Sequence, residues 1–343
     1  MQCHRFLALS LSAALIWHFV PEIPARAQTS NDVDACANAR GSREPPEENT
    51  KTFNPRLAVL YGRFIQAAYT MYRNDPTNLT PSPSHDFPAG YQLTAWIHMQ
   101  DFSMFGSTGP VFYGFIAHSA EDPHFAILAI RGTDNIEEWW DAISSLGMKS
   151  FIVPNCGNVG MGWETLYETL EVVERPPAAV GGTPQSLKAV GGFAVQVKEL
   201  LKRYATNAGS PPMNVASNEM VVTGHSIGAA LATLYAAENA LIHKIRIHAL
   251  YTFGSPRMGD HEFVDVFNRL PLESHRIVNQ QDIVPKVPGL FYQHVNTEQL
   301  FDSTGKVRQS TSCYHALATY LSLIDPTLPP DPGCQLPGHV GVR

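Results

Sequence analysis

Residues 221–228 constrain the fold most, because they join an apolar strand pattern to a helix pattern through the sequence Gly-His-Ser-Ile-Gly. A serine between two glycines at such a junction is typical of a nucleophile elbow, a strained turn that exposes the serine at the edge of a sheet. The alternative is an ordinary glycine-rich turn, and the flanking strand and helix patterns favour the elbow. Ser226 is therefore a candidate nucleophile, and its neighbour His225 is expected to be structural.

Strand patterns alternate with helix patterns along most of the chain. Residues 125–131 are almost continuously apolar, as in a strand that is buried on both faces of a sheet. The alternation predicts an α/β fold in which a mostly parallel central sheet is flanked by helices. The expected strands are 111–118, 125–131, 220–223, 246–253 and 275–279, and the expected helices are 57–72, 185–205, 227–241 and 316–324. Residues 28–55 are expected to form an irregular N-terminal arm.

Length, charge and cysteine spacing exclude several classes of protein. The 343 residues allow one large domain or two small ones, and the uninterrupted alternation favours one domain over residues 28–343. The net charge of −7 excludes the dominant basic surface that binding to nucleic acid needs. No metal site and no cofactor are expected, because the cysteines lack metal-binding spacing and the histidines are scattered.

Residues 1–27 have the pattern of a secretory signal peptide. Arg5 precedes the apolar run 6–20, and residues 25–27 read Ala-Arg-Ala, which fits a cleavage site. The run is shorter than the ~18 residues that a membrane-spanning helix needs, so no transmembrane segment is expected in the mature chain. Cleavage removes Cys3 and leaves an even set of cysteines, which suits an oxidising compartment. We expect an extracellular or periplasmic protein.

A serine hydroxyl becomes a good nucleophile only when a base takes its proton and an acid orients that base. In hydrolases with this elbow, the acid follows the serine along the chain and the histidine follows the acid. Three aspartates and three histidines after Ser226 enter the choice. They are Asp260, Asp282 and Asp302, and His294, His315 and His339.

Four sequence blocks resemble the class 3, or fungal-type, lipase family of the α/β-hydrolase fold. They are AIRGT at 129–133, VTGHSIGAALATL at 222–234, TFGSPRMGD at 252–260, and RIVN at 276–279 with DIVP at 282–285. Together they span most of the mature chain. The resemblance implies an α/β-hydrolase fold with a short lid helix, and hydrolysis of carboxylic esters through an acyl-enzyme.

The resemblance also implies roles for individual residues. Asp282 in the DIVP block matches the family's catalytic acid, whereas Asp260 lies in a block expected to be structural. His315, just before the last helix, matches the catalytic base, and His294 matches a non-catalytic strand position, so we favour His315. The backbone N–H of Ile227 and the residue Thr133 are expected to bind the oxyanion, with Arg131 holding their loop.

Residues 134–146 correspond to the family's amphipathic lid. Its apolar positions recur at helical spacing and are Ile136, Trp139, Trp140 and Ile143. Such a face would bind a lipid surface through its tryptophans, and permanent packing on the body is the alternative. The family often ties its N-terminal arm to its C-terminal tail, which implies the disulfides Cys36–Cys334 and Cys156–Cys313.

The predicted function is that of a secreted serine carboxyl-ester hydrolase, with triacylglycerol as the first substrate. Its partner would be a lipid or another ester at a lipid–water interface. Phospholipase A1, feruloyl-type and polyester esterase activities are alternatives that the motifs do not separate. A catalytically silent lipid-binding relative belongs to another class, and the complete set of Ser226, Asp282 and His315 argues against it.

Overall fold

The computed structural model describes residues 30–41, 52–103, 106–133, 147–177, 181–207, 219–296 and 298–337. The predicted signal peptide and the candidate lid residues Ile136, Trp139, Trp140 and Ile143 lie outside these ranges. None of the helices within them has the length and the apolar character that crossing a membrane requires.

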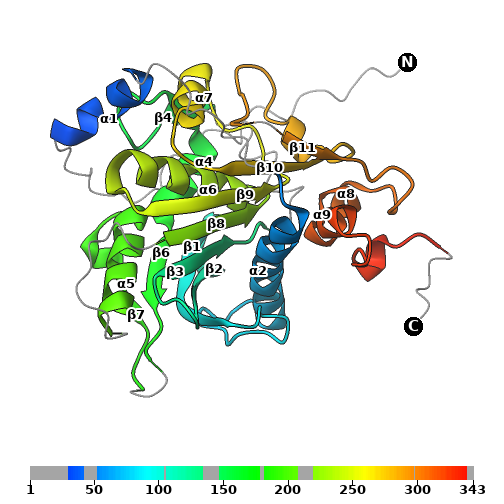
Figure 1. The fold of residues 1–343 in the computed structure, drawn as a ribbon. Coiled ribbons are helices and arrows are strands. Elements are labelled where there is room, and N and C mark those ends of the chain that lie inside the picture. Colours follow the sequence, from blue (N-terminus) through cyan, green and yellow to red (C-terminus); the bar gives the residue numbers. More distant parts are fainter. Residues whose placement is uncertain are drawn as a thin grey trace, which may run out of the picture.

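A nine-stranded sheet in the order β11-β10-β9-β8-β3-β2-β1-β6-β7 forms the centre of the fold (Figure 1). Neighbours from β11 to β3 are parallel, and the pairs from β3 to β7 are antiparallel, so only β2 and β6 run against the other strands of this sheet. The predicted α/β-hydrolase architecture with a mostly parallel sheet is therefore confirmed. The strands are β1 (Tyr91–Ser103), β2 (Gly106–Ser119), β3 (Phe125–Ile130), β6 (Glu171–Glu174), β7 (Gln185–Ser186), β8 (Glu219–His225), β9 (Arg246–Phe253), β10 (Ser274–Asn279) and β11 (Glu298–Phe301).

Helices cover both faces of this sheet (Figure 1). Helices α2 (Pro55–Asn74) and α9 (Leu317–Ile324) lie on one face, and α4 (Met161–Thr169), α5 (Phe193–Asn207) and α6 (Ile227–Glu238) lie on the other. Outside these layers are α1 (Ser30–Gly41), α7 (His261–Asn268) and the small pair of β4 (Met148–Ser150) and β5 (Asn158–Gly160). Short turns complete the described chain: η2 (Lys188–Val190), η4 (Asn239–His243), η5 (Val284–Lys286), α8 (Thr311–His315) and η6 (Pro332–Cys334).

Strand β3 shows how the sequence builds two cores. Ala126, Leu128 and Ile130 face the core on the α6 side, whereas Ile127 and Ala129 face the core beneath α2. Because alternate side chains of a strand point to opposite faces, burial on both faces requires an uninterrupted apolar run. Every residue of α6 is buried as well, and its alanines allow close packing against β8 and β9.

Two expectations about secondary structure were wrong. The helix expected from residue 185 begins at Phe193, because Gly191 takes a φ of 142° that ends any helix before it, and residues 185–186 instead pair with β6. The N-terminal arm contains the helix α1, whose weak amphipathic pattern gave no signal. Helix α1 has little apolar surface to pack against the body, and the disulfide between Cys36 and Cys156 anchors it instead.

The disulfide pairing implied by the family is also wrong. The structure joins Cys36 to Cys156 and Cys313 to Cys334, with Cα–Cα distances of 5.5 and 5.3 Å. Helix α1 and the C-terminal tail lie on opposite sides of the molecule (Figure 1), so the expected bridge between Cys36 and Cys334 cannot form. The tail folds back on the segment before α8 instead, where the N–H of Arg308 donates to the Cys334 carbonyl at 2.8 Å.

Candidate active site

Ser226 lies at the turn between β8 and α6. Its φ of 59° falls in the left-handed region, which is rare for a residue with a side chain and marks strain at functional turns. Its N–H donates to the carbonyl of Phe253 at the end of β9, at 2.9 Å. Glycine is required on both sides, because a Cβ at Gly224 would overlap the Gly228 carbonyl and one at Gly228 would overlap the carbonyls of Ile130 and Arg131. The predicted strand–turn–helix geometry is present.

Asp282 lies in the turn that follows β10 and is completely buried. Its Oδ2 accepts hydrogen bonds from His315 Nδ1 at 2.6 Å and from the Tyr320 hydroxyl at 2.5 Å, and its Oδ1 accepts from the Val284 N–H at 2.9 Å. Burial alone would raise the pKa of the Asp282 carboxyl. The charge of the His315 imidazole and the hydrogen bonds from all three donors, His315 included, outweigh burial and hold that pKa below its usual value.

His315 is the last residue of α8 and is 5% exposed. Its Nε2 has no hydrogen-bond partner among the described residues, so this nitrogen is available to a proton donor. Gly254, with a φ of 58°, lies beside it, because a Cβ built there would be 3.1 Å from His315 Cε1 and 3.2 Å from Asp282 Oδ2. The N–H of Ser226 is hydrogen-bonded to Phe253, the residue just before Gly254. The serine, the aspartate and the histidine therefore lie together where β8, β9 and β10 end.

The structure does not bring the rival residues to this point. His294 Nε2 bonds the carbonyl of Pro285 at 2.6 Å, and burial with the charge of Arg276 lowers the pKa of His294 to about 4. Asp260 caps the N-terminus of α7 by accepting from the Phe263 N–H at 2.9 Å. Asp302 is an exposed turn residue bonded to Thr304, and His339 lies outside the described residues.

Hydrogen bonds from Arg131 hold the loop after β3 beside Ser226. Arg131, although 2% exposed, donates through Nε and Nη2 to the Phe112 carbonyl and through Nη1 to the Gly132 carbonyl, at 2.7–3.0 Å. Its guanidinium also stacks on the Tyr72 ring at 3.6 Å. A Cβ at Gly132 would be 2.7 Å from the Ser226 Cβ, so the chain entering Thr133 passes against the elbow. This confirms the expected supporting role of Arg131.

A chain of hydrogen bonds connects this loop to the histidine. The Gly132 N–H donates to the Tyr69 hydroxyl, which is bonded to His225 Nδ1, and His225 Nε2 is bonded to the backbone carbonyl of His315, each at 2.8 Å. A carbonyl can only accept, so His225 carries its proton on Nε2 and accepts from Tyr69 on Nδ1. Burial lowers the pKa of His225 well below its usual value, which keeps the ring neutral.

Two residues at this site were absent from the sequence-based candidates. Tyr69 lies on α2, and Tyr320 lies on α9. Both tyrosines lie at positions where any aromatic residue would fit a buried helix face. No local sequence pattern shows that the hydroxyl of a tyrosine makes a hydrogen bond at the site. The structure also confirms that His225 is a structural residue of the elbow, since both of its ring nitrogens are engaged.

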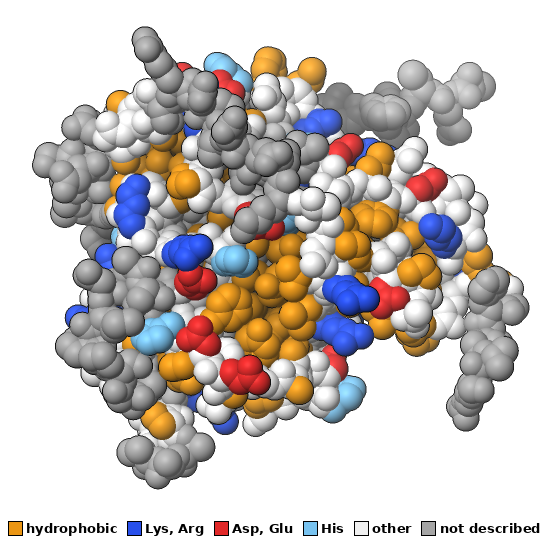
Figure 2. Space-filling view, in the orientation of Figure 1, with side chains coloured by type: hydrophobic (Ala, Val, Ile, Leu, Met, Phe, Trp, Pro, Cys, Tyr) orange, Lys and Arg blue, Asp and Glu red, His pale blue; other side chains and the backbone are white. Residues whose placement is uncertain are grey.

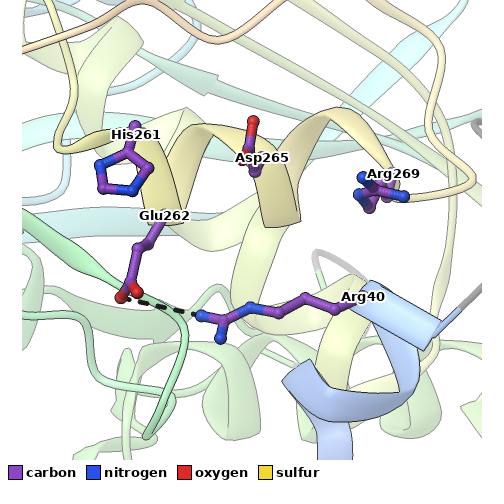
Figure 3. A pocket seen from close by; sticks show the side chains of 5 residues that line it. All are labelled: Arg40, His261, Glu262, Asp265 and Arg269. Atoms are coloured by element: carbon purple, nitrogen blue, oxygen red, sulfur yellow. Dashed lines mark ion pairs between the residues drawn. The ribbon is translucent and has the colours of Figure 1, made fainter.

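A cavity of about 270 Å³ lies between α1 and α7, away from the residues described above (Figure 3). Its lining is charged, and Glu262 pairs with Arg40 across it at 3.8 Å. Asp265 points away from that pair and Arg269 lies at the far end of the helix (Figure 3), so the side chains do not converge on a common point. No serine among the described residues lines this cavity, whereas the candidate catalytic residues lie at the ends of the parallel strands.

A sheet of this order with a serine elbow, a buried acid and a histidine defines an α/β-hydrolase. Residues 127–292 match the family model described as lipase (class 3). Over this segment the chain is similar to the class 3 lipase family, in agreement with the four sequence blocks. The match covers the elbow and Asp282, and His315 lies beyond its end.

Curated relatives carry phospholipase names. Phospholipase A1-Igamma3 of Arabidopsis thaliana, which is chloroplastic, is 25% identical over 86% of this chain and 65% of its own length. Phospholipase A1-II 1 of Oryza sativa subsp. indica is 31% identical over 52% of this chain and 43% of its own. This chain therefore spans less than two thirds of the length of these relatives.

Solved structures of fungal lipases share the fold. Lip2 lipase of Yarrowia lipolytica matches with a TM-score of 0.52 at 18% identity, over 72% of this chain and 78% of its own. A lipase of Rhizopus microsporus var. chinensis matches with a TM-score of 0.51 at 19% identity, over 75% and 80%. At this identity the likeness establishes the architecture alone.

Proposed function

We propose that this chain is a secreted serine carboxyl-ester hydrolase that acts on lipid esters. The observation that carries the proposal is the 2.6 Å hydrogen bond between Asp282 and His315 beside the strained Ser226. The opposite nitrogen of His315 has no partner among the described residues and can take the serine proton. A nucleophile, a base and an oriented acid are the parts that acyl transfer requires.

The reaction would run through an acyl-enzyme. Ser226 Oγ attacks the ester carbonyl carbon as its proton passes to His315 Nε2, and Asp282 stabilises the imidazolium through Nδ1–H. We assign the oxyanion to the N–H of Ile227, at the start of α6, and to Thr133. The intermediate then expels the alcohol, which takes the proton from His315. A water repeats these steps on the acyl carbon and returns the proton to Ser226.

Three substitutions test this assignment. Ser226→Ala and His315→Ala should each lower kcat on a soluble p-nitrophenyl ester by at least about 10⁴-fold, because removing one member disables the set. His294→Ala is the matched control, since it removes a buried histidine that does not contact Asp282, and it should retain most of the activity. An inactive His294 variant beside an active His315 variant would reverse the assignment of the base.

Triacylglycerol is the first substrate that we propose, because the sequence of residues 134–146 predicts an amphipathic face with two tryptophans, which suits an oil surface. Phospholipase A1 activity is the second candidate, and the names of the curated relatives favour it. Emulsified triolein and phosphatidylcholine vesicles, compared at equal surface area, separate the two. Free fatty acid from triolein with little lysophospholipid supports the first candidate, and the reverse supports the second.

Export is the remaining part of the proposal. Disulfides persist in oxidising compartments, and both pairs of the described chain are formed. Expression with the native N-terminus should yield an exported protein whose first residue is Gln28. N-terminal sequencing checks this, and an exported or cell-bound protein that retains residues 1–27 would contradict it.

A further inference from the structure

The loop between η5 and β11 presents two apolar side chains to water. Leu290 is 84% exposed and Phe291 is 85% exposed, well above Leu300 on β11 at 53%. Phe291 has a φ of 75°, a conformation that is unfavourable for an aromatic residue. Hydrophobic side chains reach the surface at the upper edge of the molecule in Figure 2, where this loop stands out from the body in Figure 1.

Both ends of this loop are fixed to the body. The Arg257 N–H donates to the Val287 carbonyl, and Arg257 Nη1 donates to the Pro288 carbonyl, each at 3.0 Å. On the far side, Gln293 exchanges backbone bonds of 2.7–2.9 Å with Met258 and Gly259. The two apolar side chains are therefore displayed on a held turn, and a surface that buries them need not first order the backbone.

The proposed catalytic acid lies just ahead of this loop. Asp282 precedes η5, after which the loop begins, and the next residue, Ile283, is 47% exposed. At the other end, the Tyr292 hydroxyl donates to the carbonyl of Gly147, the first described residue after the candidate lid, at 2.5 Å. A surface that covers the tip would thus lie against the same edge of the sheet that carries the site.

The charge of the loop suits a lipid surface. Residues 283–296 contain no acidic residue and one cation, Lys286, in a chain of net charge −7. A tip of Leu and Phe, with a tyrosine and a lysine nearer the body, has the order of side chains that favours the boundary between headgroups and acyl chains. The absence of carboxylates removes the main cost of approaching lipid phosphates.

We propose that Leu290 and Phe291 insert into a lipid surface and hold the edge bearing Asp282 against it. The inference rests on the proposed function, because it names the surface on which the ester substrate is met. These side chains bind lipid rather than a second copy of the chain or another protein. A protein partner would need an extended apolar face, whereas the tip offers only two projecting side chains.

Binding is measured on the full chain carrying Ser226→Ala, so that vesicles are not consumed. Leu290→Ser with Phe291→Asn should reduce partitioning into phosphatidylcholine vesicles, measured by sedimentation, by about tenfold for each side chain. Asn tolerates positive φ and should preserve the turn. Leu300→Ser is the matched control and should bind like the parent. Equal binding by the double variant, or an equal loss in the control, overturns the proposal.

Further measurements separate other outcomes. With Ser226 present, the double variant should hydrolyse a dissolved p-nitrophenyl ester at an unchanged rate and lose rate on lipid aggregates, whereas equal losses on both would place the tip inside the site and overturn the anchor. If light scattering shows that the parent is a dimer and the double variant a monomer, the two side chains contact a second copy of the chain, and the lipid anchor is overturned. If the parent hydrolyses no ester, the proposed function fails while sedimentation still decides the anchor.

Discussion

Asp282, at the end of the parallel strands, and Glu164, on α4, are both 0% exposed. Three donors meet the Asp282 carboxylate, and its pKa lies below the usual value. Neither oxygen of Glu164 has a well-aligned hydrogen-bond partner among the described residues, and burial raises the pKa of Glu164 to about 8. The comparison shows that burial alone does not set the charge of a carboxyl group, because the donors that surround it decide the sign of the shift.

The neighbours of the two acids explain the difference. The charge of Lys149 lowers the pKa of Glu164, but Lys149 forms its ion pair with Glu168, at 2.7 Å, and not with Glu164. Glu238, on α6, is bonded by Tyr167 at 2.7 Å and adds negative charge to the same region. Glu164 therefore keeps its proton, whereas the environment of Asp282 is built for a carboxylate.

Asp282→Asn should give the largest effect in this comparison. The amide retains the shape of the carboxylate but cannot stabilise an imidazolium at His315, so kcat on a soluble ester should fall by about 10⁴-fold. Steady-state kinetics measure the loss, and circular dichroism shows whether the fold is retained. Asp260→Asn is the matched control, because that residue caps α7 and should leave kcat unchanged. A loss below tenfold at Asp282 would exclude it as the acid.

Sequence patterns predicted those parts of the site that depend on local order along the chain. The elbow at Ser226 follows from a strand pattern, two glycines and a helix pattern, and β3 follows from one continuous apolar run. The DIVP block singled out Asp282, and the family's histidine before the last helix singled out His315, and the structure brings these two residues within hydrogen-bonding distance. These features are fixed by neighbours in sequence or by a shared motif.

Partners from distant elements escaped prediction. Tyr320 and Tyr69 look like core residues of their helices, and Glu164 looks like the polar side of α4, because hydrophobic periodicity does not report what a side chain meets across the interface. The disulfides failed for the same reason. Cysteine spacing leaves three pairings open, and the choice depends on where α1 packs.

Glu164→Gln should give the next largest effect, on stability rather than on rate. The native pKa of about 8 lies above the ordinary glutamate pKa of 4.5, so the native state retains a proton that the unfolded state releases above pH 4.5. The wild type therefore loses stability as pH rises from 4.5 to 8 and is unaffected by this group below that window. The neutral amide should raise the free energy of unfolding at pH 8 by on the order of 3 kcal/mol, with no gain near pH 4.

Urea unfolding of both proteins across this pH range measures the difference. Glu168→Gln, on the same helix, is the control, because it breaks a partly exposed pair worth at most ~1 kcal/mol and should show little pH dependence. A Glu164→Gln variant whose stability difference from the wild type is the same at every pH would mean that the carboxyl is ionised in the native state. The contrast with Asp282 would then disappear.

Tyr320→Phe should give the smallest effect and the sharpest distinction. It removes one of three donors from Asp282, and a hydrogen bond to a charged group is worth roughly 1.5–3 kcal/mol, so kcat/KM should fall by about tenfold. The hydroxyl helps to lower the pKa of Asp282, so its loss raises that pKa. This change moves the acid limb of the pH–rate profile toward higher pH.

Tyr251→Phe provides the control for that shift. Tyr251 is 1% exposed, and its hydroxyl has no hydrogen-bond partner among the described residues. Tyr251→Phe therefore removes a buried hydroxyl without removing a hydrogen bond from a carboxylate. The control should leave both kcat/KM and the acid limb in place. If the two variants lose rate equally and neither moves the acid limb, Tyr320 acts through packing. A displaced acid limb in Tyr320→Phe alone means that its hydroxyl helps to keep the buried Asp282 charged, whereas neither oxygen of Glu164 has a well-aligned partner in the part of the chain that the structure describes.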